Sequence, residues 1–366
     1  KRNRRKMSNT DFYKDKRILV TGHTGFKGTW LSLMLEYLGA DTFGYALENS
    51  DKTPFFEMTS PHILESCYGL IQDRNRIYDY VCKIKPEIVI HFASHSTLNK
   101  GNEITSYIFD SNVTGLVNLL EAVRSVDTVK AVLIVTSDKC YKNLESDEGY
   151  REDSMLGAQD PYSTSKACQE LITECYRKSF FSRGRLNIPI ATARASNVIG
   201  GGDYNLTRLF PYLLDCFSRG IPAGIRNPGA IRPWQNVLDV LGGYLMLVRK
   251  LYESEDGDSI YASAFNFGPE SDGFVTVARA AEMLSSQFEN SDYKTSISSE
   301  SVIETNILKL DSSKAKNLLK WFPIYSFEDT ISQSAEFSKR SAGGEKVRDI
   351  AMEFIERYMK GNKNVG

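Results

Sequence analysis

A tyrosine and a lysine lie four residues apart in the segment YSTSK, at Tyr162 and Lys166. Residues at positions i and i+4 share one face of a helix, so the ammonium group can lower the pKa of the phenol, normally about 10. A phenol with a lowered pKa can act as an acid or base toward an alcohol. The plain alternative is a surface aromatic residue beside a solvated lysine, because this spacing is common by chance.

A second group of polar side chains follows a buried apolar segment. Residues 131–136 read AVLIVT, which predicts a buried strand. The strand is followed directly by Ser137, Asp138 and Lys139. Ligands of parallel sheets bind at the carboxyl ends of the strands. Since the Tyr–Lys pair opens the next predicted helix, a hydroxyl, a phenol and an ammonium can converge on one carbinol group of a substrate. The alternative is a solvated Asp–Lys pair in a surface loop.

The third motif is a glycine-rich turn between the first predicted strand and the first predicted helix. Residues 21–28 read TGHTGFKG. Glycine permits the tight turn and lets a pyrophosphate approach the backbone, while the following helix N-terminus offers free N–H groups. The context favours a dinucleotide cofactor over a bare structural turn. The residues expected to contact it here are Gly22, Thr24, Gly25, Phe26, Lys27 and Gly28.

The end of the second predicted strand bears on which dinucleotide binds. A carboxylate that recognises the ribose is expected there. The segment reads Gly44-Tyr45-Ala46-Leu47, without an acid, and Glu48 follows one position later. The residues therefore leave NAD against NADP open.

Two further segments carry arginine in predicted loops. Residues 194–203 begin with Arg194, and residues 225–237 contain Arg226 and Arg232. A guanidinium group suits a diphosphate because it can donate two parallel hydrogen bonds. Surface arginine is the plain alternative.

Alternating strand and helix patterns position these motifs. Strands are expected at 17–21, 42–47, 65–71, 87–92, 131–136 and 188–193, and helices at 26–38, 73–85, 104–125, 162–180 and 327–360. Strands separated by helices of this length indicate a Rossmann-type, doubly wound α/β fold with a parallel sheet. We expect a cofactor-binding domain at 15–198 that holds the catalytic residues. Residues 199–366 are expected to form mainly a smaller, mixed α/β substrate-binding domain, with some segments returning to the first domain.

Composition narrows the class of protein. The 366 residues carry 45 basic and 46 acidic side chains, a balance that argues against a nucleic-acid partner. The longest apolar run is far shorter than the roughly 18 residues of a membrane helix, so no membrane partner is expected. The six cysteines form no C-x-x-C pair and the four histidines lie in the first 95 residues, so free thiols in the cytoplasm and no metal site are expected.

Together the motifs resemble those of the extended short-chain dehydrogenases/reductases that act on nucleotide sugars. The resemblance spans about residues 16–324, and its segments are TGHTGFKG at 21–28, TSDKCY at 136–141, DPYSTSK at 160–166, NVIGGGD at 197–203, IRNP at 225–228, RPWQNVL at 232–238, NFGP at 266–269 and LKLDSSKA at 308–315. The Asp-Lys pair after Ser137 is similar to that of 4,6-dehydratases acting on CDP-sugars. The resemblance therefore implies CDP-glucose as substrate, NAD as cofactor, a homodimer built on helices 104–125 and 162–180, and a place in deoxysugar and O-antigen biosynthesis.

The resemblance also implies a role for each catalytic residue. Tyr162, ionised with help from Lys166, takes the 4-hydroxyl proton while hydride leaves C4, and Ser137 shares that hydrogen bond. Asp138 protonates the departing 6-hydroxyl, and Lys139 assists removal of the C5 proton. Hydride return at C6 then gives a 4-keto-6-deoxy sugar. Ala93, Ser94, Tyr162 and Lys166 are the implied further cofactor contacts, and Asn197, Arg208 and Arg232 the implied contacts to the nucleotide diphosphate.

Two positions depart from the family pattern. Leu70 follows Gly69 where relatives have a carboxylate that meets adenine, and Asn99 stands where relatives have an arginine after the fourth strand. The alternative functions are another nucleotide-sugar epimerase or dehydratase of the same family, such as a 4-epimerase, and a non-catalytic nucleotide-binding regulator. The Asp-Lys pair argues against the epimerase, which eliminates no water, and retention of Ser137, Tyr162 and Lys166 argues against the regulator.

Overall fold

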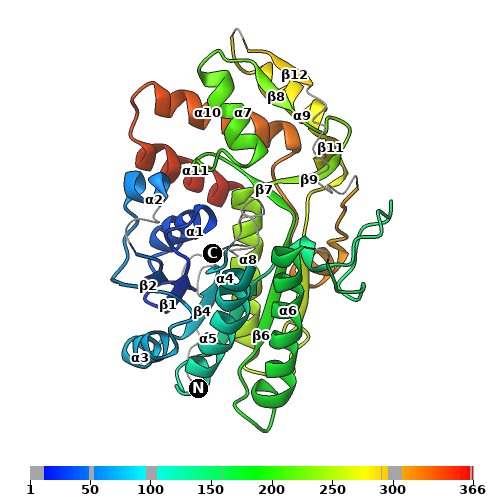
Figure 1. The fold of residues 1–366 in the computed structure, drawn as a ribbon. Helices are drawn as coiled ribbons and strands as arrows, with labels where there is room; N and C mark the ends of the chain where they lie inside the picture. Colours follow the sequence, from blue (N-terminus) through cyan, green and yellow to red (C-terminus); the bar gives the residue numbers. More distant parts are fainter. Residues whose placement is uncertain are drawn as a thin grey trace.

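The computed structural model describes residues 12–48, 53–95, 105–158, 160–289, 291–295, 307–362 and 365. Figure 1 shows a larger part built around one sheet, with a smaller part above it. All six cysteines are free thiols. Among the helices formed by these residues, none is long and apolar enough to cross a membrane.

The larger part is organised by a seven-stranded sheet. Its strands are β1 (Arg17–Thr21), β2 (Asp41–Ala46), β3 (Glu65–Tyr68), β4 (Ile88–His91), β5 (Ala131–Val135), β6 (Ile190–Ala195) and β10 (Ala264–Phe267). The order is β10-β6-β5-β4-β1-β2-β3, and every neighbouring pair is parallel. The chain moves outward from β1 on one side and returns to β4 on the other. This doubly wound order confirms the expected fold class and opens a crevice at the carboxyl ends of β1 and β4.

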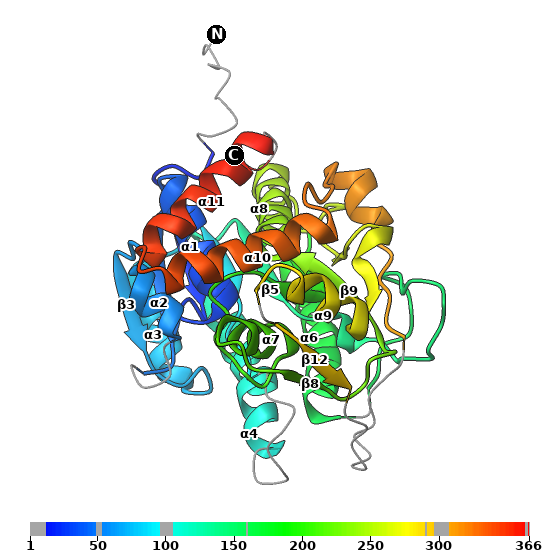
Figure 2. The same cartoon turned by 90° about the horizontal axis from the view of Figure 1, so that it is seen from above.

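Helices cover both faces of the sheet (Figure 2). One face carries α1 (Phe26–Tyr37), α8 (Val237–Ser254) and α11 (Val347–Gly361), and the other carries α3 (Arg74–Ile84), α5 (Gly115–Arg124) and α6 (Pro161–Tyr176). The central strands are apolar along nearly their whole length because both of their faces are buried.

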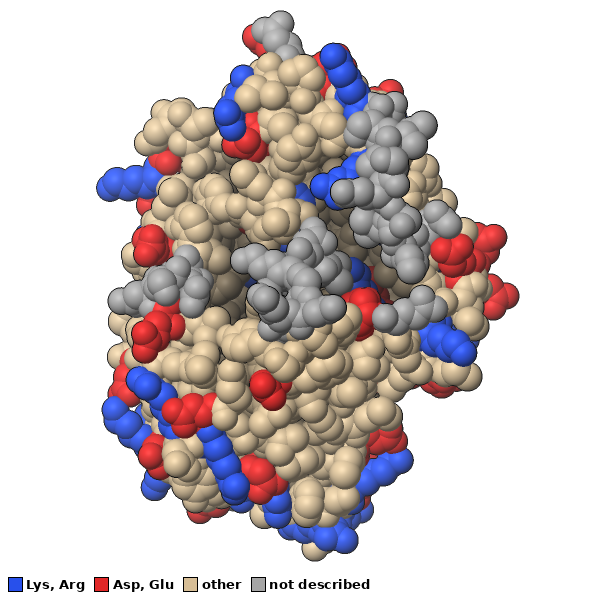
Figure 3. Space-filling view, viewed as in Figure 1, with Lys and Arg blue, Asp and Glu red and all other residues tan. Residues whose placement is uncertain are grey.

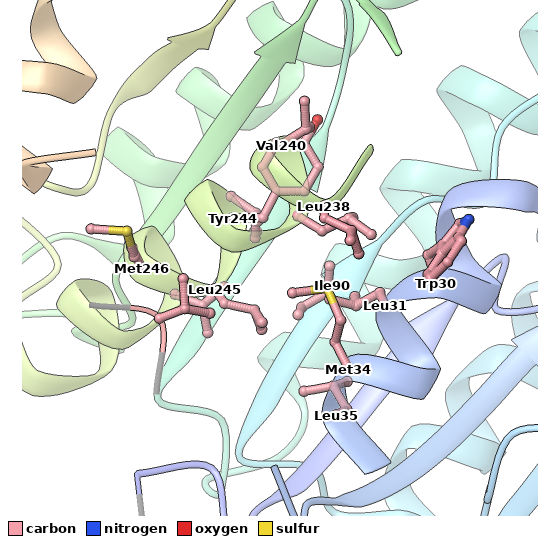
Figure 4. Packing of buried hydrophobic residues seen from close by; sticks show 14 of the residues in the cluster. Trp30, Leu31, Met34, Leu35, Ile90, Leu238, Val240, Tyr244, Leu245 and Met246 are labelled. Carbon is pink, nitrogen blue, oxygen red and sulfur yellow. The ribbon is translucent and has the colours of Figure 1, made fainter. Parts of the chain in front are cut away.

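The core between α1, α8 and the sheet holds the glycine-rich turn in place. Figure 4 shows side chains of α1 and α8 meeting over Ile90 of β4. The labelled members are Trp30, Leu31, Met34, Leu35, Ile90, Leu238, Val240, Tyr244, Leu245 and Met246. Each large apolar side chain that is fully buried contributes about 1.5–3 kcal/mol. The N-terminus of α1 is thereby fixed at the sheet's carboxyl edge.

The smaller part holds two short sheets and three helices. Its elements are β7 (Asn197–Ile199), β9 (Ile231–Asn236) and β11 (Phe274–Thr276) in one sheet, β8 (Ala223–Ile225) and β12 (Tyr293–Thr295) in the other, and α7 (Leu209–Ser218), α9 (Val277–Ser285) and α10 (Phe327–Ala342). These helices share a hydrophobic cluster with β8 and β9. A further helix, α2 (Pro54–Thr59), packs beside α1 and α11.

The second half of the chain also completes the large sheet. β10 adds a strand beside β6, and α8 covers β5. The sequence patterns did not predict α8, although Asn236 caps it by accepting the Leu238 N–H at 2.9 Å. Strand β6 runs to Ala195, two residues beyond the predicted end, because Arg194 and Ala195 pair with Asn266 and Phe267 of β10.

Three predicted helices are interrupted. The helix expected at 104–125 consists of α4 (Thr105–Phe109), a π turn at Asp110–Thr114 and α5. The helix expected at 162–180 is α6 followed by a π turn at Arg177–Phe181. The stretch expected at 327–360 is two helices, α10 and α11, separated after Gly343; the next residue, Gly344, has φ of 87°. Short helical turns also occur at Asp138–Cys140, Ser271–Gly273 and Ala315–Leu319.

Candidate active site

The catalytic residues expected from the sequence meet between the end of β5 and the start of α6. Ser137 has an extended backbone and caps the short turn Asp138–Cys140. Its hydroxyl donates to Oδ1 of Asp138 at 2.9 Å and accepts the Lys139 N–H at 3.2 Å. Tyr162 lies in the first turn of α6, close enough to Ser137 for the serine side chain to act on the phenol by lowering its pKa. The structure therefore brings the predicted hydroxyl, phenol and carboxyl together.

Asp138 is the most enclosed acid of this group. Its side chain is buried, and Oδ2 has no hydrogen-bond partner. Burial raises the pKa of the carboxyl, while the positive charges of Lys139 and Lys27 act in the opposite direction. A buried carboxyl with one free oxygen and a raised pKa can hold a proton and deliver it to a bound molecule.

The Tyr162 phenol and the Lys166 ammonium influence each other less than the sequence suggests. Lys166 Nζ lies 5.8 Å from the centre of the Tyr162 ring. Burial and the Asp138 charge raise the pKa of Tyr162 to about 12, against the expectation that Lys166 lowers it. Burial and the charge of Lys27 lower the pKa of Lys166 to about 7. In this structure the phenol is protonated at neutral pH.

Two residues that sequence reasoning missed hold Lys166. Its ammonium donates to the Val135 carbonyl at 3.3 Å and to Oε1 of Gln169 at 3.0 Å. Gln169 Nε2 donates in turn to the main-chain carbonyl of Asn112 at 2.8 Å. The Asn112 side chain binds both main-chain groups of His95, with His95 N to Oδ1 at 2.7 Å and Nδ2 to the His95 carbonyl at 3.1 Å.

The glycine-rich turn is shaped for a close approach of another molecule. Gly22 has φ of 73°, and a Cβ there would lie 2.8 Å from the Ala93 nitrogen. A Cβ on Gly28 would lie 2.1 Å from the Gly22 carbonyl oxygen, so α1 packs directly on the turn. Gly25 caps α1 without any side-chain hydrogen bond, which leaves the helix N-terminus for an anionic ligand. These features fit the pyrophosphate of a dinucleotide.

The other predicted cofactor residues lie around this turn with different contacts. The Phe26 side chain belongs to the hydrophobic core, and the Thr24 carbonyl accepts the Thr53 hydroxyl at 2.9 Å. Ala93 N donates to the Thr21 hydroxyl at 3.2 Å, and Ser94 Oγ is buried without a partner. An unpartnered buried hydroxyl beside the crevice fits a polar ligand group.

Lys27 faces the catalytic group as well as the turn. Burial lowers the pKa of its ammonium to about 8, with Arg208 acting in the same direction and Asp138 in the opposite one. Lys27 therefore contributes positive charge beside Asp138 and Lys166.

The predicted diphosphate residues belong to the smaller part. Asn197 lies on β7 beside Trp234 of β9, and Arg232 lies on β9 and donates to the Ile231 carbonyl at 3.0 Å. Arg208 precedes α7, pairs with Asp203 at 2.9 Å and interacts electrostatically with Tyr162. Figure 3 shows the surface hollowed between the two parts of the molecule. Arg208 thus links the smaller part to the catalytic group.

Arg194 fits neither the diphosphate contact suggested for its segment nor the alternative of a surface arginine. It lies on β6, is 4% exposed and forms an ion pair with the buried Glu170 at 2.8 Å. Its guanidinium also donates to the Tyr141 hydroxyl at 2.7 Å. The arginine is a structural residue because it neutralises a buried carboxylate.

Of the two residues that depart from the family pattern, Leu70 and Asn99, the structure describes only Leu70. Leu70 is 46% exposed at the end of β3, and its carbonyl accepts the Tyr45 hydroxyl at 2.9 Å. Asn99 lies outside the described residues. Among the described residues, no cluster of three or more His, Cys, Asp or Glu side chains could hold a metal ion.

Comparison with known proteins extends over nearly the whole chain. The family described as GDP-mannose 4,6 dehydratase matches residues 19–334. The chain is 37% identical to the CDP-glucose 4,6-dehydratase of Salmonella typhimurium over 358 residues, which cover 96% of this chain and 99% of the relative. It is 25% identical to a dTDP-glucose 4,6-dehydratase of Xanthomonas campestris, over 87% of this chain and 92% of the relative.

Solved structures share the fold. The dTDP-glucose 4,6-dehydratase of Bacillus anthracis, in complex with NAD, superposes with a TM-score of 0.73 at 22% identity and covers 90% of this chain and 99% of its own. The UDP-glucose 4-epimerase of Thermotoga maritima, with UDP-glucose, gives a TM-score of 0.74 at 20% identity over 89% of this chain and 99% of its own.

Proposed function

Because the chain belongs to the GDP-mannose 4,6 dehydratase family, we propose that it is an NAD-dependent nucleotide-sugar 4,6-dehydratase that converts CDP-glucose to CDP-4-keto-6-deoxyglucose. The observation that carries the proposal is the buried Asp138 carboxyl, with its free oxygen, beside the Ser137–Tyr162 pair. An epimerase needs the pair but no acid for a leaving hydroxyl. The 37% identity to a CDP-glucose 4,6-dehydratase supports the same choice.

The residues around the first turn fit the cofactor. Gly22, Gly25 and Gly28 leave room for the pyrophosphate, and the uncapped start of α1 offers N–H groups to it. Tyr162, Lys166 and Ser94 are the proposed contacts to its nicotinamide half. NAD, when bound, supplies a positively charged ring that takes a hydride from C4 of the sugar and gives one back at C6. NADP remains the alternative because β2 ends without an acid.

The first step is removal of the proton from the sugar 4-hydroxyl. The Tyr162 phenol gives its own proton to solvent, and the phenolate oxygen then accepts the proton of the 4-hydroxyl. The Ser137 hydroxyl keeps the sugar oxygen and the phenol in one hydrogen-bonded group. The protonated Lys166 stabilises the phenolate. Since the resting phenol has a pKa of about 12, a positive charge must lie close to it when it ionises.

The second step is loss of water across C5 and C6. The new 4-keto group acidifies the C5 proton, and Lys139 assists its removal. Asp138 donates its proton to the departing 6-hydroxyl, which leaves as water, and burial favours the protonated form of Asp138 by raising the pKa of its carboxyl. Lys139 Nζ lies 6.0 Å from the Tyr162 ring centre, which supports a shared role of the two groups at one bound sugar.

The smaller part supplies the contacts to the nucleotide. Asn197, Arg208 and Arg232 are the proposed diphosphate contacts, and Arg208 lies close enough to Tyr162 to affect its pKa. The proposal that the nucleotide base is cytosine rests on the similarity to the Salmonella typhimurium CDP-glucose 4,6-dehydratase. We further propose a cytoplasmic homodimer that supplies a deoxysugar precursor for surface polysaccharide of the O-antigen type.

The test is product analysis on a panel of nucleotide sugars with NAD or NADP. The protein is incubated with the CDP, UDP, dTDP and GDP derivatives of glucose, and each product is weighed by mass spectrometry. A product of CDP-glucose lighter by one water, formed fastest among the four, supports the proposal. A product with the mass of the substrate but a different NMR spectrum favours the epimerase, and cofactor binding without any change in mass or NMR spectrum favours the regulator.

A further inference from the structure

Gln169 connects the catalytic lysine to a neighbouring helix. It lies three residues after Lys166 on α6, and its side chain is completely buried. Oε1 accepts the Lys166 ammonium at 3.0 Å, and Nε2 donates to the Asn112 carbonyl at 2.8 Å. One amide side chain thereby spans the gap between α6 and the π turn.

The orientation of this amide follows from its two partners. A main-chain carbonyl can only accept, so the NH₂ group of Gln169 must face Asn112. A lysine ammonium can only donate, so the oxygen must face Lys166. No other arrangement of the amide satisfies both neighbours, and a buried polar group left unpaired costs about 1–3 kcal/mol.

The π turn makes the Asn112 carbonyl available to Gln169. In this turn, the Gly115 N–H bonds to the Asp110 carbonyl five residues back, which widens the helix beside α6. The Asn112 side chain also donates to the Ser165 hydroxyl at 2.9 Å, so Asn112 holds α6 at two points. The position of Lys166 is thus set by a helix that contributes no catalytic side chain.

We propose that Gln169 is a positioning residue that holds Lys166 beside Tyr162 and sets the pH at which the Lys166 ammonium loses its proton. The proposal rests on the proposed function, in which the protonated Lys166 stabilises the Tyr162 phenolate. The Gln169 oxygen favours the charged form of the lysine by accepting a hydrogen bond from it.

Several other groups act on the same ammonium. They are Lys27 on α1, His91 on β4, Cys140 in the turn after β5, and Tyr162 and Glu170 on α6. Burial and Lys27 favour loss of the proton, whereas Glu170 and Cys140 oppose it. His91 is neutral because burial lowers its pKa to about 3. Gln169 is therefore a neutral group that opposes the effect of burial on the lysine.

The test measures the titration of Lys166 directly. The protein is labelled with ¹³C- and ¹⁵N-lysine, the Lys166 signal is assigned by its loss in Lys166→Met, and its chemical shift is followed against pH in the absence of substrate. We expect Gln169→Leu to lower the Lys166 midpoint by about one pH unit, because the hydrogen bond to the charged form is lost. Gln169→Glu, which has nearly the same shape, is expected to raise it by about one unit.

Gln235 provides the matched control. It is also a buried glutamine with two hydrogen bonds, from Nε2 to the Ser196 hydroxyl at 2.6 Å and to the Phe267 carbonyl at 2.7 Å. Gln235→Leu should lower stability as Gln169→Leu does and leave the Lys166 midpoint unchanged. An unchanged Lys166 midpoint in Gln169→Glu would overturn the proposal, and this variant keeps the test decisive if Gln169→Leu does not fold. Because the titration needs no substrate, its result is separate from whether the wild-type protein dehydrates a nucleotide sugar.

Discussion

The Ser137 hydroxyl donates to Oδ1 of Asp138 at 2.9 Å, and the second oxygen of that carboxyl has no partner although it is buried. A hydroxyl has one hydrogen to give, so Ser137 can only accept from other donors while this bond to Asp138 is in place. The resting site therefore holds a protonated phenol and a carboxyl whose second oxygen is buried without a hydrogen-bond partner. A dehydration needs one group that moves the 4-hydroxyl proton and one that protonates the leaving hydroxyl. The Tyr162 phenol and the Asp138 carboxyl, proposed for these two tasks, both lie beside Ser137.

Asp138→Asn separates the two proton transfers. The amide oxygen can still accept from Ser137, but the side chain has no proton to give to a leaving hydroxyl. We expect oxidation at C4 to persist and loss of water to slow by about 10²–10⁴-fold. Quenching with borodeuteride and mass spectrometry would detect the 4-keto sugar that has kept its 6-hydroxyl. Equal slowing of both steps would contradict the role of Asp138.

The buried ion pair Arg194–Glu170 can be tested by stability alone. Arg194→Met leaves the Glu170 carboxylate in the interior without its cation, which costs about 3–5 kcal/mol of unfolding free energy. Arg279→Met, which breaks an exposed pair with Glu282, is the matched control and should cost less than about 1 kcal/mol. Urea denaturation measures both. Similar losses in the two variants would show that the buried pair contributes no more than a surface one.

The sequence predicted the sheet and the glycine turn because their patterns are local. Residues 17–21 and 131–136 are apolar runs that need no partner to be recognised, and TGHTGFKG follows the first of them directly. Helix α8 was missed because it follows a stretch in which short strands, Pro and Gly obscure the helical period. Arg194 was misassigned because its partner Glu170 lies on another element, and a pair across elements leaves no spacing in the sequence.

In the candidate site, as in the fold, the sequence indicated what residues close together in the chain form, and it did not indicate contacts between distant elements. Ser137, Asp138 and Lys139 are adjacent in the chain, and Tyr162 and Lys166 lie one helical turn apart, so their types and spacing indicate the chemistry. The hydrogen bond from Gln169 to the Asn112 carbonyl joins residues that are 57 positions apart in the sequence. Asn112 lies in a π turn, which no local sequence pattern predicted. The raised pKa of Tyr162 arises from burial, which only the folded structure provides.

Gly28→Ala tests the packing of α1 against the cofactor turn. The new methyl carbon would lie 2.1 Å from the Gly22 carbonyl oxygen, so the turn must move. Alanine is favoured over glycine in a helix by about 1 kcal/mol. A loss of NAD affinity in Gly28→Ala must therefore come from the close contact with Gly22. We expect NAD affinity, measured by calorimetry, to fall at least about tenfold. Gly229→Ala is the control, since a Cβ there meets nothing within 4 Å, and an equal loss in both variants would contradict the account.

Asp239 predicts a pH dependence of stability. It is buried, accepts the N–H groups of Ile324 and Tyr325 at 2.9 and 3.1 Å, and burial raises its pKa to about 7. A carboxyl whose pKa is raised on folding contributes stability that is complete below its unfolded pKa of about 3.9 and is lost as pH rises through about 7.

Asp239→Asn should remove this contribution. We expect the wild-type protein to lose a few kcal/mol of unfolding free energy between about pH 4 and pH 7 relative to the variant, and the difference to stay constant above about pH 8. Denaturation at a series of pH values measures it. A wild-type-minus-variant difference that does not change with pH would show that Asp239 titrates normally in the folded protein.

The most direct test of the proposed dehydration is turnover of CDP-glucose with NAD in deuterated water, followed by mass spectrometry and NMR of the product. Removal of the C5 proton and its replacement from solvent predict a product that has lost one water and carries one deuterium, at C5, with no net reduction of the cofactor. A product that keeps the mass of CDP-glucose, or one that lacks deuterium at C5, would contradict the assignment of Tyr162, Asp138 and Lys139 to a 4,6-dehydration.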